Sequence, residues 1–208
     1  MTARHGWART AALLAAVGLA AAACGSDAEE PAGSTGSAPS IAGVRSLDYT
    51  GKEWHLHFLG ALTYAQSPPF GGAHSPVPLN CGVYSVPVPN ENAVHSLEHG
   101  AVWLTYRDGV DPAPLAALTS VDTSYTLVSP YPTQSAPVVA STWGLQLAVD
   151  SPTDPRLRQF VETYVANGLG GEQGARCAGA SPEQAAGLRD NPPEQNPSAP
   201  PVPADRPG

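Results

Sequence analysis

One methionine, Met1, and three cysteines are all the sulfur in the 208-residue sequence. The apolar run at residues 11–23 is too short to cross a bilayer as a helix of the mature protein. It follows two arginines, Arg4 and Arg9, and is typical of a secretory signal peptide, which we predict at residues 1–23. Removal of this segment would also remove Met1, so the mature chain would have no thioether, the ligand that favours Cu(I).

Basic residues are scarce. Without residues 1–23, 8 lysines and arginines face 18 aspartates and glutamates, which gives a formal net charge of −10. An acidic surface of this size repels phosphate backbones and anionic lipid headgroups, so nucleic acid is disfavoured as a partner. Attachment to a membrane would therefore need a lipid anchor.

The cysteines predict such an anchor and one disulfide. The stretch LAAAACGSD resembles the lipobox of bacterial lipoproteins, with Ala21 where that pattern usually has leucine. We therefore predict lipidation of Cys24 and a protein held on the extracytoplasmic side of the cell membrane, with an ordinary signal peptide cut elsewhere as the alternative. Cys81 and Cys177 then remain as an even number in an oxidising compartment, which favours a disulfide over a metal-ligand role for Cys81.

Two segments of biased composition flank the predicted domain. Residues 24–42 are rich in glycine, serine, proline and acidic residues, which predicts a lipidated flexible tether. Residues 181–208 are dense in proline and predict a disordered tail. Residues 43–180 are predicted to form a single small α+β domain, with a mostly antiparallel sheet and a few short helices.

The pattern within the domain alternates strands with few helices. Predicted strands lie at residues 53–64, 82–88, 101–106, 125–130, 136–142 and 144–150. A short helix capped by Asn90 or Asn92 should end at Gly100, and another should lie around residues 115–118. The clearest helix follows Asp154, a capping residue, and should end at Gly168.

All five histidines of the mature chain fall within 45 residues, and they come from different elements. His55 and His57 share one face of a predicted strand, and His74 lies in a loop rich in glycine and proline. His95 and His99 are four residues apart and project from one side of a helix. Because neutral imidazole binds zinc, copper, nickel and iron, this set predicts a transition-metal site. The alternative is that the imidazoles only donate hydrogen bonds to backbone carbonyls.

Glu98 completes a His-x-x-Glu-His sequence, the inverse order of the helix motif of zinc proteases. In that arrangement the histidines bind zinc and the glutamate activates water. The predicted helix is short and no second acidic helix offers a further ligand, so Glu98 is a weak candidate for a catalytic base. It could instead orient an imidazole or be a solvated charge.

Several blocks resemble a bacterial family catalogued only as a domain of unknown function, family 3105, found in secreted, lipid-anchored and membrane-anchored proteins of actinobacteria and other groups. They are PPFGGAH, NCGVYSVPVPNENAVHSLEHGAVWLTY, LVSPYP and APVVASTWG, and the similarity covers about residues 45–180. The family's first histidine precedes a tyrosine by seven residues, so Tyr64 selects His57 over His55. The resemblance brings no established activity. It implies a shared set of four histidines, which are His57, His74, His95 and His99.

The function predicted from the sequence is binding of Cu(II) or Zn(II) by these four histidines in an exported, lipid-anchored protein. Two other functions stay open. The first is a metal-free extracytoplasmic interaction module with exposed tryptophan or tyrosine contacts, and the second is a metallohydrolase of the cell envelope that uses Glu98. An enzymatic activity is not expected, and the sequence identifies neither a protein partner nor a substrate.

Overall fold

The structure is a computed structural model that describes residues 40–47 and 52–190. Its centre is a six-stranded sheet with the order β1-β6-β5-β3-β4-β2. Antiparallel pairing joins β1 to β6, β6 to β5 and β5 to β3, whereas β3, β4 and β2 run parallel. The predicted α+β class with a mostly antiparallel sheet is confirmed. The strands are β1 (Val44–Ser46), β2 (Gly82–Val83), β3 (Val102–Tyr106), β4 (Thr126–Pro130), β5 (Val138–Thr142) and β6 (Leu145–Val149).

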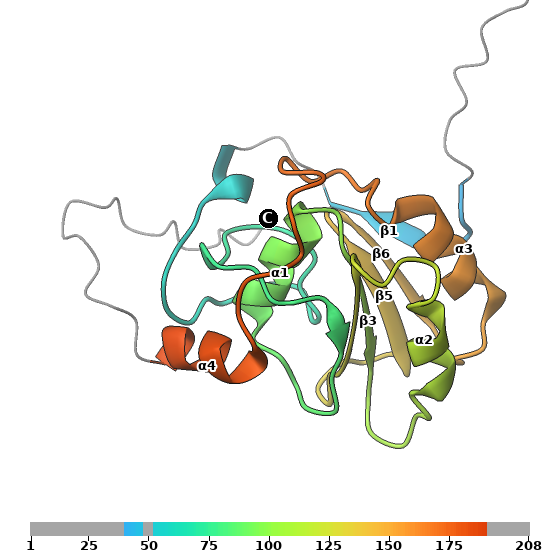
Figure 1. Ribbon diagram of the computed structural model, residues 1–208. Helices are drawn as coiled ribbons and strands as arrows, with labels where there is room; N and C mark the ends of the chain where they lie inside the picture. Colours follow the sequence, from blue (N-terminus) through green and yellow to red (C-terminus); the bar gives the residue numbers. More distant parts are fainter. Residues whose placement is uncertain (1–39, 48–51, 191–208) are drawn as a thin grey trace, which may run out of the picture. The chain divides into compact units, whose positions relative to one another are not determined.

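Helices cover both faces of this sheet. The helices of the described residues are η1, a 3-10 helix (Lys52–His55), α1 (Asn90–Glu98), α2 (Ala113–Leu118), α3 (Pro155–Tyr164) and α4 (Pro182–Asp190). In Figure 1, α1 lies on one side of the sheet, and α2 and α3 lie on the other. The domain therefore has three layers, with the sheet in the middle.

The alternation of side chains along β3 divides the core into two clusters. Val102 and Leu104 pack with residues of α2 and α3, whereas Trp103 packs with residues of α1. Successive side chains of a strand point to opposite faces, so a strand covered on both faces reads as a continuous apolar run. This explains why the sequence of β3 is apolar at nearly every position.

The predicted helix after Asp154 is present as α3. The Asp154 side chain accepts a hydrogen bond from the backbone N–H of Arg156 at 2.9 Å, and Pro155 occupies the first turn. The helix ends at Tyr164, earlier than the predicted Gly168, because Ala166 has a positive φ of 55° and its N–H donates to Gly100 O.

The predicted helix that carries His95 and His99 is present as α1, but its predicted cap is wrong. Pro89 occupies the N-cap, and no side chain of residues 40–47 or 52–190 caps the helix. The Asn92 amide instead donates to Ser75 Oγ and to Val77 O, at 3.1 and 2.7 Å, so it holds a neighbouring loop. Gly100 follows the helix with φ +102°, a value that favours glycine, as predicted.

The predicted strand at residues 53–64 is not formed. Its start is η1, and the only pairing in this stretch among the described residues is the bridge between His57 and His74. The apolar residues of the segment do not make a buried face, since Leu56 is 36% exposed. Without such a face, alternation of residue types is not enough to add a strand to the sheet.

Both flanks of the predicted domain need correction. Ile41, expected in the tether, is 5% exposed and belongs to the core. The tail predicted from residue 181 is wrong for α4, because Ala185 is fully buried in the cluster beside α1. The predicted signal peptide, Cys24 and the tether before residue 40 lie outside the described residues, as does the tail beyond residue 190.

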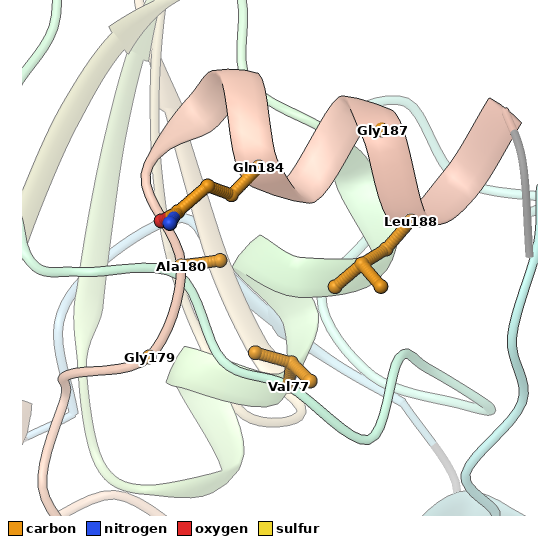
Figure 2. Close-up of a pocket in the computed structure, with 6 residues that line it drawn as sticks. All are labelled: Val77, Gly179, Ala180, Gln184, Gly187 and Leu188. Atoms are coloured by element: carbon orange, nitrogen blue, oxygen red, sulfur yellow. The ribbon is translucent and has the colours of Figure 1, made fainter. Parts of the chain in front are cut away.

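The disulfide between Cys81 and Cys177 is present, with a Cα–Cα distance of 5.4 Å. Beside it, α4 covers an open pocket of about 450 Å³ (Figure 2). None of its lining residues is titratable: Val77, Gly179, Ala180, Gln184, Gly187 and Leu188. Among the described residues, no helix is long and apolar enough to cross a membrane.

Candidate metal centre

Three segments bring the histidines together at α1. His95 lies in α1, His99 is the C-cap residue that follows it, and His74 comes from the glycine-rich loop before it. The segment of His57 pairs with this loop, since Phe58 N–H donates to His74 O at 2.7 Å and His74 N–H donates to Leu56 O at 3.0 Å. These two hydrogen bonds place the rings of His57 and His74 with their centroids 4.8 Å apart.

The orientation of three imidazoles is fixed by backbone carbonyls. In each ring Nδ1 lies within hydrogen-bond distance of a carbonyl oxygen: His74 with Gly72 at 2.7 Å, His95 with Ser75 at 2.6 Å and His99 with Arg176 at 2.8 Å. A carbonyl oxygen can only accept, so Nδ1 carries the hydrogen. In the neutral ring Nε2 then has a free lone pair. Histidines that bind metals are usually oriented in this way.

The free nitrogens of the α1 pair face each other. Nε2 of His95 and Nε2 of His99 lie 2.9 Å apart. With both rings neutral and both hydrogens on Nδ1, two lone pairs meet at this distance, and that of His99 also faces Oε2 of Glu172 at 3.1 Å. A cation bound by these atoms would remove the repulsion. Burial lowers the pKa of His95, the hydrogen bond to Ser75 raises it, and the neighbouring histidines lower it; together these effects bring it to about 4. His95 is therefore neutral at pH 7.

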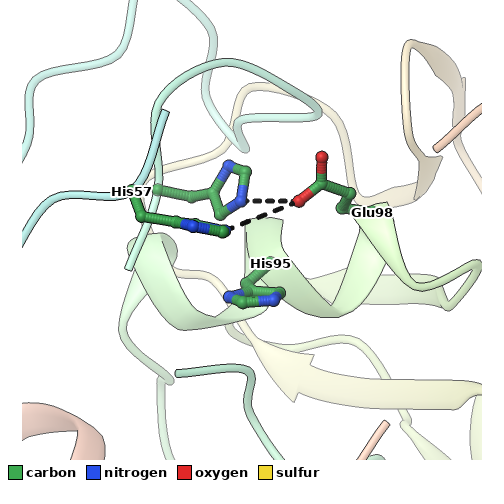
Figure 3. Close-up of side chains that lie close together, drawn as sticks. His57, His95 and Glu98 are labelled. Carbon is green, nitrogen blue, oxygen red and sulfur yellow. Dashed lines mark ion pairs between the residues drawn. The ribbon is translucent and has the colours of Figure 1, made fainter. Parts of the chain in front are cut away.

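Four ligand atoms form what we call the inner group. Nε2 or Nδ1 of three histidines and one carboxylate oxygen lie within 4.8 Å of one another: His57, His74, His95 and Glu98. Nε2 of His74 and Oε2 of Glu98 are 2.8 Å apart and buried, yet among the described residues neither has a hydrogen-bond partner of acceptable geometry. In Figure 3, His57 and the Glu98 carboxylate point toward each other, and their Nε2 and Oε2 are 3.8 Å apart.

Three ligand atoms form a second set, the outer group, made up of His95, His99 and Glu172. Oε2 of Glu172 lies 3.1 Å from Nε2 of His99 and 3.8 Å from Nε2 of His95. The Glu172 side chain is 49% exposed, whereas that of Glu98 is 1% exposed. The two groups share His95 and differ in their access to solvent.

The family model described as "Protein of unknown function (DUF3105)" matches residues 55–179, more than half of the chain. The chain belongs to this family. The predicted resemblance is therefore confirmed. Comparisons with curated proteins and with solved structures found no match.

The region that matches the DUF3105 model, residues 55–179, includes every residue of the inner group and of the outer group. Of the four predicted ligands, His57, His74 and His95 lie together in the inner group. His99 is not in that group and is connected to it through His95. The predicted set is thus split between two overlapping groups, and each group includes a carboxylate.

Glu98 is enclosed by imidazoles. Burial raises the pKa of its carboxyl, but the imidazoles of His74 and His55 outweigh burial and lower it to about 2. His55, the extra histidine of the sequence pattern, contacts Oε1 of Glu98 through Nδ1 and stacks on Trp143 with ring centroids 5.3 Å apart. Glu98 is therefore a buried carboxylate anion, oriented as a ligand or as an anchor for imidazoles.

Sequence reasoning missed Glu172. It is delivered by residues 170–177, which we call the closing segment. Gly170 allows this segment to pass over α1, because a Cβ there would collide with the backbone of Glu98. Gly174 N–H donates to His99 O, and Cys81 N–H donates to Cys177 O beside the disulfide. The signal that could have found Glu172 is the pair of glycines before it and the cysteine after it.

Proposed function

We propose that this DUF3105 protein is exported, anchored by a lipid at Cys24, and binds a divalent transition metal, Zn(II) or Cu(II), at its histidine cluster. The observation that carries the proposal is the approach of two imidazole lone pairs, on His95 and His99, to 2.9 Å. Two nitrogen ligands of one tetrahedral zinc ion lie about 3.3 Å apart, given zinc–nitrogen bonds of about 2.0 Å. The pair is therefore already close to the spacing of two ligands of one ion.

The buried polar atoms of the inner group support the same conclusion. Burial of a polar atom without a partner is unfavourable, and most buried polar groups have a hydrogen bond. Nε2 of His74 and Oε2 of Glu98 lie 2.8 Å apart, but neither makes a hydrogen bond of acceptable geometry within the described part of the chain. A metal ion would accept both lone pairs and would offset the negative charge of the carboxylate in its buried position.

The donor atoms favour zinc or Cu(II) over softer ions. The described site offers imidazole nitrogens and carboxylate oxygens, and Cys81 and Cys177 are joined in a disulfide. Thiolate and thioether ligands, which select Cu(I), are therefore not supplied by these cysteines. Imidazole and carboxylate ligands bind both Zn(II) and Cu(II), so both ions belong in the first experiment.

The two other candidate functions have less support. A general base needs access to a water and a substrate, whereas Glu98 is 1% exposed and contacts imidazoles through both oxygens. An interaction module was expected to use exposed tryptophan or tyrosine contacts, and of these side chains Trp103 and Trp143 are at most 1% exposed. Both aromatic side chains pack in the core beside α1.

The metal content of the full chain, purified without a histidine tag, tests the proposal. After treatment with a chelator and loading with Zn(II) or Cu(II), we expect one ion per chain by elemental analysis. The double variant His95→Ala, His99→Ala should lose at least about 100-fold in affinity, since loss of even an outer-shell partner typically weakens a site about 10- to 100-fold.

Arg158→Ala, on the opposite face of the sheet, serves as the control and should bind like the unaltered chain. Circular dichroism would establish that the double variant is folded. Negligible metal in the unaltered chain, or unchanged metal in the folded double variant, would contradict the proposed function.

The lipid anchor has a separate test. Cells given a labelled fatty acid should incorporate the label into the protein, and Cys24→Ser should abolish this incorporation and release the protein from the membrane fraction. Label retained by Cys24→Ser would show that Cys24 is not the anchor. This result would leave the metal-binding proposal unaffected, because the histidines lie in the domain.

A further inference from the structure

We infer that the bound ion has two positions, and that His95 transfers it between them: the outer group loads the ion from solution, and the inner group holds it. The inference depends on the proposed metal binding and extends it from storage at one point to transfer along a short path. It assigns to Glu172 a role in loading, which no comparison with known proteins provides.

The shared ligand requires that the two positions be used in turn. His95 belongs to both groups, but its Nδ1 hydrogen is held by Ser75 O at 2.6 Å. Only Nε2 of His95 is free to bind an ion, and one nitrogen lone pair binds one ion. The two groups therefore cannot each be complete at the same time, and the domain should hold one ion.

The position of His95 makes transfer geometrically simple. Its ring centroid lies 4.5 Å from that of His99 in the outer group and 5.0 Å from that of His74 in the inner group. The bonds from the ion to His99 and Glu172 break as bonds to His74 and Glu98 form, while the bond to His95 persists. The ion keeps its charge, and no proton has to move, because the hydrogens of His74, His95 and His99 stay on Nδ1, where each is hydrogen-bonded to a carbonyl oxygen.

Exposure and charge set the direction of loading. The outer group presents Glu172 to solvent, 49% exposed, and its negative charge attracts a hydrated cation. The inner carboxylate, on Glu98, is 1% exposed, and His74 is fully buried. The inner group has one exposed member, His57, at 37%, but its Nε2 lies 3.8 Å from Glu98 Oε2, and the only carboxylate of this group is the buried Glu98, so it presents no exposed negative charge to a cation.

Rates and equilibria of Zn(II) binding distinguish the two groups. The metal-free full chain is mixed with Zn(II) in a stopped-flow instrument, and a chromophoric chelator reports both the association rate and the affinity. Glu172→Gln should slow association about 10-fold while changing the dissociation constant less than about 3-fold, because it alters the path more than the final site.

Glu98→Gln should weaken affinity about 10-fold or more, with a smaller effect on the association rate. His74→Gln tests the same inner group if Glu98→Gln does not fold. Glu162→Gln is the matched control for Glu172→Gln: its side chain is similarly exposed, at 54%, on the far face of the sheet, and it should match the unaltered chain.

Different outcomes would contradict the transfer and the metal binding itself. Two ions per chain would show independent sites and overturn the transfer. An unchanged association rate in Glu172→Gln, combined with slowed association in His57→Ala, would show direct loading of the inner group and overturn it as well. Absence of Zn(II) and Cu(II) binding by the unaltered chain would instead overturn the proposed function, and the transfer with it.

Discussion

The two faces of the sheet are packed in different ways. On one face, α3 buries three apolar side chains, Leu157, Phe160 and Val161. On the other face, α1 buries almost its whole surface, apolar and polar together: Glu91, Asn92, Ala93, Val94, His95, Ser96, Leu97 and Glu98. The first helix follows the usual amphipathic pattern, and the second departs from it.

The two faces contribute differently: the α3 face stabilises the fold, and the α1 face orients the side chains of the candidate metal site. Apolar packing is non-directional, so the α3 face stabilises the fold without fixing individual atoms. Each buried polar group on the α1 face needs a partner, and those partners come from distant segments, such as Ser75 O for His95 and Arg176 O for His99. The α1 face thus gains defined ring orientations, which a metal site requires.

The largest effect is expected from Phe160→Ala on the α3 face. Phe160 is fully buried, and its truncation should lower the free energy of unfolding by about 3–5 kcal/mol. Urea denaturation of the metal-free chain measures this change, and Phe160→Leu should lose much less. The Zn(II) affinity of the folded variant should stay the same, since α3 does not contribute ligands. A reduced affinity would show that the two faces are coupled.

Removal of the disulfide should affect both stability and metal binding. Cys81→Ser with Cys177→Ser frees a loop whose ends are 96 residues apart, and the free energy of unfolding should fall by about 2–5 kcal/mol. Because the closing segment carries Glu172 and the Arg176 carbonyl that orients His99, association of Zn(II) should slow, with a smaller change in affinity. Stopped-flow mixing of the folded double variant with Zn(II) measures this rate. An unchanged association rate would mean that hydrogen bonds alone hold the closing segment in place.

Acid should destabilise the α1 face of the metal-free protein through His95. Above pH 6.5 its imidazole is neutral in both the folded and the unfolded chain, so it adds no pH dependence. Between pH 6.5 and about 4 the unfolded chain binds a proton that the buried ring resists, and the free energy of unfolding should fall by about 2–3 kcal/mol. Denaturation at several pH values measures the slope, which should be shallower in His95→Gln.

The smallest effect is expected at the N-terminus of α3, where Asp154 is the capping residue. Asp154→Ala removes the side-chain acceptor for the Arg156 N–H and should lower the free energy of unfolding by about 1 kcal/mol. Asp154→Asn keeps an acceptor oxygen at the cap and should cost less. Thermal denaturation would rank the three proteins. Metal affinity should be equal in all of them, and a difference would contradict the separation between the two faces.

Much of the α3 face could be predicted from the sequence because its signals are local. A cap at Asp154, a proline in the first turn and an apolar stripe define α3 within a dozen residues. The helical placement of His95 and His99 on one side could equally be predicted, since residues four apart in a helix share a face. The segment of residues 53–64 was not, because its apparent alternation had no buried face to support a strand.

The sequence by itself determined which side chains are available for a site: five histidines in one half of the mature chain, Glu98 between two of them, and two cysteines able to pair. Only the tertiary structure decided how they are grouped. It divided the histidines around His95, brought His55 to Glu98 and carried Glu172 to His99 across 73 residues of sequence. Local patterns report neighbours within a few residues, whereas these contacts depend on how α1, its preceding loop and the closing segment pack together.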